Sequence, residues 1–342
     1  MVGKKVLFLD CTLRDGGQGL EYSYNKGLTK EFFSGTNYAN ILNAICESKV
    51  DLFELGTIDP FANDCEKFAI YTDIESISTK IKLLNKSQDK AVALYKGPDT
   101  PLDKIPDFRK NFCKNIRVIL RYSELDKSLD FCQGLAKKGY RVFVQPMLTM
   151  RYSDEELRYV AERSSKMGAF ALYIVDSYGY MDGKDISRIF KIYDEILSPE
   201  VKIGFHAHNN LNNAFSNAKF FKDICSNRSK ILDCCIAGMG QGAGNLQSEL
   251  ALSMLSSDQN QYDVASLFDA YEDMEKFHGS GLWGYSIEFA IPALCRAAYK
   301  YSHELRSNYH LKFKDIYKLL IAAPDDVKNR FCSENIKKLL NH

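Results

Sequence analysis

The chain has 342 residues, of which 45% are hydrophobic and 26% are charged, so it can bury a large core and is neither disordered nor fibrous. Its 45 basic and 44 acidic residues give a formal net charge of +1, which excludes a global field that would draw it to nucleic acid or to an anionic membrane. We therefore expect small-molecule chemistry, with no nucleic acid and no membrane as partner.

The ten cysteines lie mostly in apolar stretches, and none forms a Cys-x-x-Cys pair. The chain opens with Met-Val-Gly-Lys-Lys and runs directly into a strand-like segment, without the apolar region of a signal peptide. It also holds no apolar run long enough to span a bilayer. These features predict a cytoplasmic protein with reduced thiols.

Eight short runs rich in β-branched or aromatic residues predict strands in the first two-thirds of the chain. They are 5–10, 50–55, 91–95, 116–120, 141–145, 171–175, 201–206 and 231–236. Segments of helical periodicity separate them, such as 185–197. Ser153 and Glu156 form a capping-box pattern at one helix start, and Gly139 is a stop signal at the end of another.

Strands that alternate with helices pair in parallel, and eight units in about 240 residues indicate an α/β fold, a (β/α)8 TIM barrel. The alternative, an open doubly wound sheet, calls for a glycine-rich dinucleotide turn after the first strand, which residues 14–18 do not provide. Beyond residue 260 the pattern is wholly helical, with periodic segments at 263–277, 286–303, 312–321 and 324–341. We expect a barrel catalytic domain at 1–260 and a C-terminal helical region at 261–342, beside the barrel mouth or at a subunit interface.

Two segments at strand ends carry the strongest chemical signal, because active sites of these barrels lie at the C-terminal ends of the strands. They are Asp-Cys-Thr-Leu-Arg-Asp-Gly-Gly-Gln at 10–18 and Gly-Phe-His-Ala-His-Asn-Asn at 204–210. Side chains two apart on a strand leave on the same face, so His206 and His208 can aim two imidazoles at one point. Asp15 is the candidate carboxylate for a three-ligand metal site.

Several other polar residues end predicted strands. Arg14 carries a planar guanidinium that suits the carboxylate or enolate oxygens of a 2-oxo acid. Glu54 and Asp176 either act on substrate or hydrogen-bond other site residues. Arg117 and Arg121 either line the site or lie at a solvated rim.

The glycine-rich loop 238–245, Gly-Met-Gly-Gln-Gly-Ala-Gly-Asn, follows the last predicted strand. It is either a simple turn or a backbone that approaches a ligand closely. On the second interpretation, Asn245 is a further metal or substrate ligand.

Together, the segments 10–18, 204–210 and 238–245 resemble the signatures of the metal-dependent TIM-barrel lyase superfamily. That superfamily includes 3-hydroxy-3-methylglutaryl-CoA lyase, isopropylmalate and homocitrate synthases, and 4-hydroxy-2-oxovalerate aldolase. Asp176-Ser-Tyr-Gly179 is similar to the family's Asp-Ser-x-Gly, and the resemblance covers about residues 5–255. The glycine-rich loop is most similar to that of the aldolase branch.

This resemblance implies that Asp15, His206 and His208 hold Mn²⁺ or Mg²⁺, with Zn²⁺ or Co²⁺ as other choices, and that Arg14 steadies a pyruvate enolate. Residues 281–289 resemble, more loosely, the C-terminal segment of the aldolase branch, which implies that Tyr285 lies near the substrate. The implied activity is cleavage or formation of a 4-hydroxy-2-oxo acid from pyruvate enolate and an aldehyde. A dehydrogenase partner and a homodimer are implied as well.

Gln18 departs from the aldolase pattern, because the aldolases carry an acid/base histidine soon after the Arg-Asp-Gly. The acyl-CoA lyase and synthase branches show glutamine, and a neutral amide cannot accept a proton. Tyr285, Glu54 or water at the metal would then have to act. The alternative function is a Claisen-type acyltransferase that condenses acetyl-CoA with a 2-oxo acid.

Two further alternatives are a nonhaem iron oxygenase, which uses the same ligand types, and a barrel without catalysis. The alternating pattern of strands and helices argues against the first. The presence of all three candidate ligands argues against the second.

Overall fold

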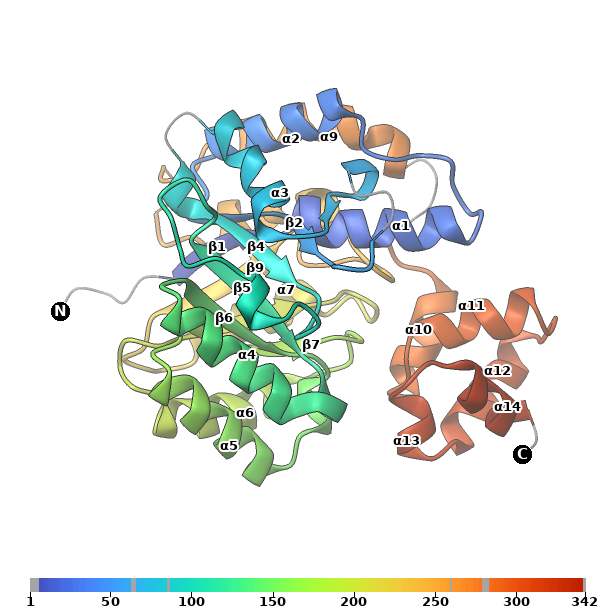
Figure 1. Ribbon diagram of the computed structural model, residues 1–342. Helices are drawn as coiled ribbons and strands as arrows, with labels where there is room; N and C mark the ends of the chain where they lie inside the picture. The colour runs from blue at the N-terminus through green and yellow to red at the C-terminus, as the bar shows by residue number, and fades with distance from the viewer. Residues whose placement is uncertain (1–5, 63–65, 85–86, 259, 279–282, 341–342) are drawn as a thin grey trace.

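The computed structural model describes residues 6–62, 66–84, 87–258, 260–278 and 283–340, and its centre is a closed parallel barrel (Figure 1). β1 pairs in parallel with both β9 and β2, which closes the ring. The predicted TIM barrel is confirmed, and an open sheet is excluded. The eight strands of the ring are β1 (Val6–Asp10), β2 (Leu52–Ile58), β4 (Ala91–Tyr95), β5 (Asn115–Leu120), β6 (Arg141–Pro146), β7 (Ala171–Asp176), β8 (Lys202–Ala207) and β9 (Lys230–Cys234).

One further strand, β3 (Ile70–Tyr71), pairs with the end of β2 and was not predicted. Two residues are too short a run to give a periodic signal. The register of β2 against β4 shifts between Glu54 and Gly56, and such a bulge redirects side chains at a barrel rim. Glu54 is therefore placed by an irregularity of the strand that the sequence pattern does not reveal.

Helices surround the barrel and pack their apolar faces on it. Ser153 and Glu156 form the predicted capping box, and Gly139 has a φ of +90° just after α4. α9 lies along α2 on the outside of the barrel (Figure 1). The surrounding helices are α1 (Gly17–Asn25), α2 (Gly35–Glu47), α3 (Ile74–Ser78), α4 (Leu125–Lys137), α5 (Asp154–Lys166), α6 (Gly183–Ile196), α7 (Ala214–Asp223), α8 (Ser248–Leu250) and α9 (Ala265–His278).

The interior of the barrel contains apolar side chains from alternating strand positions, among them Leu9, Phe143 and Ile231. One cation shares this interior. Arg117 has a fully buried side chain, and its guanidinium carbon lies 4.4 Å from the centre of the Tyr173 ring. A buried arginine needs counter-charges, and the site described below supplies them.

The C-terminal helices form a group of their own beside the barrel (Figure 1). They are α10 (Ile287–Leu294), α11 (Lys300–Ser307), α12 (Phe313–Ala322), α13 (Asp325–Lys328) and α14 (Ser333–Leu340). Their apolar faces meet in a separate cluster that includes Ile291, Tyr301, Leu305, Ile316 and Leu320. The predicted division of the chain at residue 260 stays a prediction.

Each of the predicted helical segments 286–303 and 324–341 contains two helices in the structure. Arg296 has a φ of +56° just after α10, a left-handed conformation that cannot continue a helix. Between α13 and α14, the carbonyl of Arg330 accepts hydrogen bonds from Tyr301 Oη and Asn335 Nδ2. Among the described residues, no helix has both the length and the apolarity needed to cross a membrane.

Candidate active site

Asp15, His206 and His208 converge at the C-terminal end of the barrel. Their ligand atoms all lie within 4.8 Å of one another, and all three side chains are buried. His206 lies in β8 and His208 follows it directly, while Asp15 lies in a single π-helical turn, Thr12–Gly16, after β1. The structure thus brings the three predicted ligands together.

The charge states of these groups suit a cation. Burial alone would raise the pKa of Asp15, but the charges of Arg14 and the two histidines hold it down at about 2, so the carboxylate is ionised at neutral pH. Burial lowers the pKa of His208 to about 4, against the attraction of Asp15. A neutral imidazole with a free lone pair is the form that binds a metal.

Asn245 and Gly240 lie beside the candidate ligands, and Asn245 pairs with His208 in an isolated antiparallel β-bridge. Asn245 Nδ2 donates to Asp15 Oδ2, while its Oδ1 is buried without a hydrogen-bond partner. A Cβ on Gly240 would lie 2.6 Å from Asp15 Oδ2, so only glycine leaves this oxygen accessible. The unpartnered amide oxygen and the space kept by Gly240 both fit a bound cation.

Behind the candidate ligands lies a continuous chain of buried charges. Arg14 donates from Nη1 to Asp15 at 2.7 Å and from Nε to Glu54 at 2.6 Å, which leaves Nη2 buried without a partner. The other oxygen of Glu54 lies 3.3 Å from Arg117 Nε. Arg117 in turn makes a bidentate pair with Asp233, at 2.6 and 3.0 Å.

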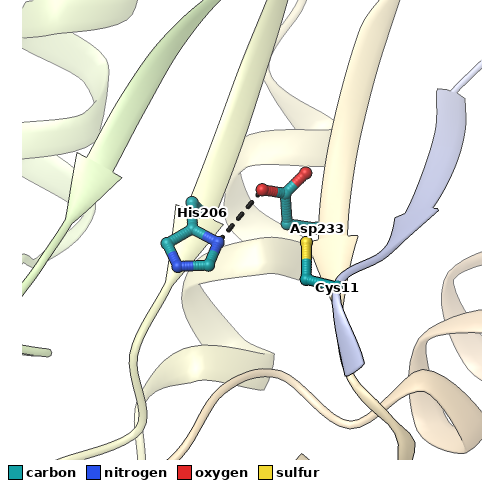
Figure 2. A group of neighbouring side chains, drawn as sticks. All are labelled: Cys11, His206 and Asp233. Carbon is teal, nitrogen blue, oxygen red and sulfur yellow. Dashed lines mark hydrogen bonds and ion pairs between the residues drawn. The ribbon is translucent and has the colours of Figure 1, made fainter. Parts of the chain in front are cut away.

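Asp233 completes this chain by contacting His206, as Figure 2 shows. His206 Nδ1 lies 3.0 Å from Asp233 Oδ2. A proton on Nδ1 that is donated to Asp233 leaves Nε2 free to bind a metal, and it fixes the orientation of the ring. Asp233 is thus a positioning residue for His206.

Cys11, His206 and Asp233 also lie close enough to be considered as metal ligands (Figure 2). Both oxygens of Asp233 already accept from Arg117, however, and burial raises the pKa of the Cys11 thiol well above its usual value. A protonated thiol beside a neutralised carboxylate is a poor ligand set. The group formed by Asp15, His206 and His208 is the better cation site.

The structure also separates the alternatives left open for the other strand-end residues. Arg117 is fully buried inside the barrel, whereas Arg121 lies at the rim, where it pairs with Asp99 and Glu124. Asp176 accepts hydrogen bonds from the backbone N–H groups of Tyr180 and Met181, so it stabilises the loop after β7. The carboxylate of Glu54 is engaged by Arg14 and Arg117.

A cavity of about 490 Å³ opens above the metal-ligand group. We call its base, formed by Arg14, Asp15, His206 and His208, the floor. The opposite side, which we call the roof, consists of six residues from the C-terminal region: Ala298, Tyr299, Lys300, Asn329, Arg330 and Phe331. Tyr178, in the loop after β7, donates from Oη to the carbonyl of Asn329 at 3.1 Å and so joins barrel to roof.

Gln18 lines this cavity and belongs to a hydrogen-bond chain across it. Gln18 Nε2 donates to Thr57 at 3.0 Å, and its Oε1 accepts from Gln241. Gln241 Oε1 accepts from Tyr299 Oη at 2.8 Å. The amide of Gln18 thus connects, through Gln241, to a hydroxyl in the roof.

Tyr285 lies in a neighbouring cavity of about 600 Å³ and is 60% exposed. Tyr299 lines both cavities, so it reaches the metal-ligand side, whereas Tyr285 does not line that cavity. Of the segment 281–289 that carried the resemblance, Gly281 and Leu282 lie outside the described residues. The expected contact of Tyr285 with substrate stays a prediction.

Sequence reasoning missed Asp233, Gln241 and Tyr299. An acid inside the apolar run 231–236 was a usable signal for Asp233, because an unpaired carboxylate is not buried in a strand. Gln241 lies in the glycine-rich loop, where only the loop as a whole was considered. Tyr299 lies among helical residues with no distinguishing pattern.

Comparisons with known proteins agree with this geometry. A family model described as HMGL-like matches residues 113–274. The resemblance to HMG-CoA-lyase-like metal-dependent TIM-barrel lyases is confirmed over this part of the chain. This family is metal-dependent, and Asp15, His206 and His208 are the residues of this chain that best fit a metal.

Among curated HMGL-like relatives, 4-hydroxy-2-oxovalerate aldolase 2 of Comamonas testosteroni is 29% identical over 276 residues, which cover 80% of this chain and 75% of that protein. Among solved structures, the N-terminal domain of a provisionally named aldolase from Bacteroides vulgatus superposes with a TM-score of 0.72 at 22% identity, covering 89% of this chain and 98% of that one. Hydroxymethylglutaryl-CoA lyase from Pseudomonas aeruginosa gives 0.58 at 16% identity, covering 81% and 94%. At these identities the two structures show the shared fold alone.

Proposed function

We propose that this protein is a divalent-metal-dependent aldolase, a carbon-carbon lyase that cleaves or forms a 4-hydroxy-2-oxo acid from pyruvate enolate and an aldehyde. The observation that carries the proposal is the meeting of two imidazoles, a carboxylate and a buried arginine on the floor of one cavity. Curated relatives named 4-hydroxy-2-oxovalerate aldolase support it. They do not favour the Claisen-type alternative.

Asp15, His206 and His208 are the residues that would hold the cation, with Asn245 as a further ligand through its unpartnered Oδ1. We propose Mn²⁺ or Mg²⁺, because the carboxylate and amide oxygens suit both, while the imidazoles also admit Zn²⁺ or Co²⁺. When bound, a cation supplies a Lewis acid for the oxygens of a 2-oxo acid.

Arg14 has the geometry to stabilise an enolate. Asp15 and Glu54 fix two of its nitrogens, and the buried Nη2 has no partner in the protein. A substrate oxygen that becomes negative as the C3–C4 bond breaks can accept this remaining N–H. The donor is already oriented, so the reaction need not reorganise it.

Cleavage also requires removal of the proton from the C4 hydroxyl, while the electrons of the C3–C4 bond pass to the pyruvate fragment. Glu54 is engaged by two arginines, and Gln18 cannot take up a proton. We assign proton exchange to Tyr299, whose hydroxyl is held by Gln241 at the same cavity. In the addition reaction the phenol gives its proton to the C4 alkoxide and regains one from water; cleavage is the reverse, in which the phenolate formed by proton loss to water takes the proton of the C4 hydroxyl. Burial raises the pKa of Tyr299 well above its usual value, so in the direction of addition the phenol is ready to protonate the alkoxide.

The test is an assay of pyruvate release from 4-hydroxy-2-oxovalerate with Mn²⁺, beside an assay of CoA release from acetyl-CoA with a 2-oxo acid. We expect pyruvate and no CoA. Arg14→Lys should lose most of the turnover, because the ammonium group of lysine cannot reproduce the planar set of N–H donors of the guanidinium. CoA release without pyruvate release would contradict the aldolase assignment.

The resemblance also motivates our proposals of a dehydrogenase partner that takes up the aldehyde and of a homodimer. The cytoplasm is the proposed location. All described cysteines are free thiols, which is typical of a reducing compartment. Size-exclusion chromatography with light scattering tests the dimer, and copurification with an NAD-dependent activity tests the partner.

A further inference from the structure

We propose that the aldehyde half of the substrate carries an anionic group, a carboxylate or a phosphate, and that Arg151, Lys300 and Arg330 bind it. We call these three residues the anion subsite. The inference rests on the proposed aldolase function and deepens it, because it specifies which class of 4-hydroxy-2-oxo acid the cavity accepts.

The first observation is the charge of the cavity. Five basic residues line it, whereas Asp15 is its one acidic lining residue in the described part of the chain. Asp15 is already paired with Arg14. The basic lining residues are Arg14, Arg121, Arg151, Lys300 and Arg330.

The second observation is that the three cations of the anion subsite have no carboxylate partner among the described residues. Arg121, by contrast, is neutralised by Asp99 and Glu124. Arg151 lies over the ring of Tyr122, with its guanidinium carbon 4.7 Å from the ring centre, and Lys300 Nζ lies 4.5 Å from the centre of the Tyr22 ring. Aromatic faces support these cations but leave their N–H groups free for an anion.

The third observation is that the backbone holds Arg151 firmly in place. Leu148 has a φ of +59°, a strained conformation for leucine, and its N–H donates to Ser177 Oγ at 2.9 Å. Val175 donates from its N–H to Thr149 Oγ1, also at 2.9 Å. The short turn that ends in Arg151 is therefore tied to the loop after β7, which also lines the cavity.

Arg330 is fixed in a similar way from the roof. Its carbonyl accepts from Tyr301 and Asn335, and the carbonyl of the preceding Asn329 accepts from Tyr178. The anion subsite thus joins a barrel loop to the C-terminal region, at the same cavity as the metal-ligand group. A substrate whose 2-oxo acid end lies on the floor would direct its aldehyde end toward these cations.

A neutral aldehyde half gives these cations nothing to bind. An oxyanion would accept several charge-assisted hydrogen bonds, each stronger than a bond between neutral groups. Gln145 adds a polar group to the same cavity, because its Oε1 is buried without a hydrogen-bond partner. A substrate hydroxyl can donate to this oxygen, which fits a polar aldehyde half better than a methyl group.

The experiment compares three substrates of the Mn²⁺-loaded protein by pyruvate release. They are 4-hydroxy-2-oxovalerate with a neutral methyl end, 4-hydroxy-2-oxoglutarate with a carboxylate, and 2-oxo-3-deoxy-6-phosphogluconate with a phosphate. We expect kcat/KM for at least one anionic substrate to exceed that for the neutral one by about tenfold or more, the scale of one charge-assisted hydrogen bond. Whether the carboxylate or the phosphate is preferred identifies the source of the oxyanion.

Arg151→Gln and Arg330→Gln should each lower the ratio of kcat/KM, anionic over neutral, by about tenfold. Arg158→Gln is the matched control, because Arg158 pairs with Glu195 on the outer helices and should leave the ratio unchanged. Pyruvate release from all three substrates without an anionic preference would overturn the anion subsite and leave the aldolase assignment standing. Pyruvate from none of them would overturn both.

Discussion

The floor and the roof of the active-site cavity differ in whether their charged side chains have counter-charges within the protein. On the floor, Arg14 and Asp15 are buried and paired with each other and with residues behind them. In the roof, Lys300 and Arg330 carry charges that no described carboxylate balances. The charges of Arg14 and Asp15 are paired within the protein and leave Arg14 Nη2 for a substrate oxygen, whereas those of the roof have no counter-charge among the described residues. The barrel thus supplies the candidate metal ligands and Arg14, whereas the C-terminal region supplies Tyr299 and two of the three residues of the proposed anion subsite.

The substitution with the largest expected effect on the floor is the removal of a candidate metal ligand. His208→Ala should abolish stoichiometric Mn²⁺ binding, because the two remaining ligands cannot hold the cation, while the barrel stays folded. Calorimetric titration with Mn²⁺ measures the loss of binding, and circular dichroism checks that the fold is retained. Retention of one Mn²⁺ per chain would remove His208 from the site.

Removal of the Tyr299 hydroxyl should have the next largest effect. Tyr299→Phe should lower kcat for cleavage about a hundredfold with little change in KM, the scale of one general acid or base. Tyr285→Phe is the matched control, since Tyr285 lies in the neighbouring cavity, and its effect should be far smaller. The reverse ranking of the two variants would return the role to Tyr285.

A substitution in the chain of buried charges behind the floor should strongly lower the free energy of unfolding. Asp233→Asn leaves Arg117 buried without its bidentate partner, at a cost of about 3–5 kcal/mol in the free energy of unfolding. Urea denaturation measures this cost. Weaker Mn²⁺ binding should accompany it, since His206 loses the carboxylate that orients its ring.

An equivalent substitution at the cavity rim should lower the free energy of unfolding much less. Asp99→Asn also removes a partner of an arginine, Arg121, but that guanidinium is 30% exposed and keeps Glu124. We expect a loss of about 1 kcal/mol or less in the free energy of unfolding. A loss as large as that of Asp233→Asn would contradict the contrast between a buried network and a solvated edge.

Prediction from the sequence succeeded where a residue's role follows from local periodicity. The eight strands, the capping box at Ser153 and the two histidines at the end of β8 all follow from spacings of two to four residues. Prediction failed where a role depends on contacts between distant strands. Arg117 and Asp233 meet across the barrel although 116 residues separate them.

The break in helical segment 286–303 was missed for a related reason. The side-chain pattern around Arg296 is helical, and only the backbone there leaves the helical region. Tyr299 and Lys300 reach the cavity because α10 ends before them. Their roles therefore depend on a local conformation that the sequence pattern does not reveal.

The C-terminal helices have a small hydrophobic cluster separate from that of the barrel. Substitutions that repack this cluster can shift Arg330 or Lys300 without disturbing the ring of strands. Substitutions among these helices can therefore change which aldehyde is accepted while the enolate chemistry stays the same. The C-terminal helices are the part of the molecule in which we expect homologous enzymes to diverge first.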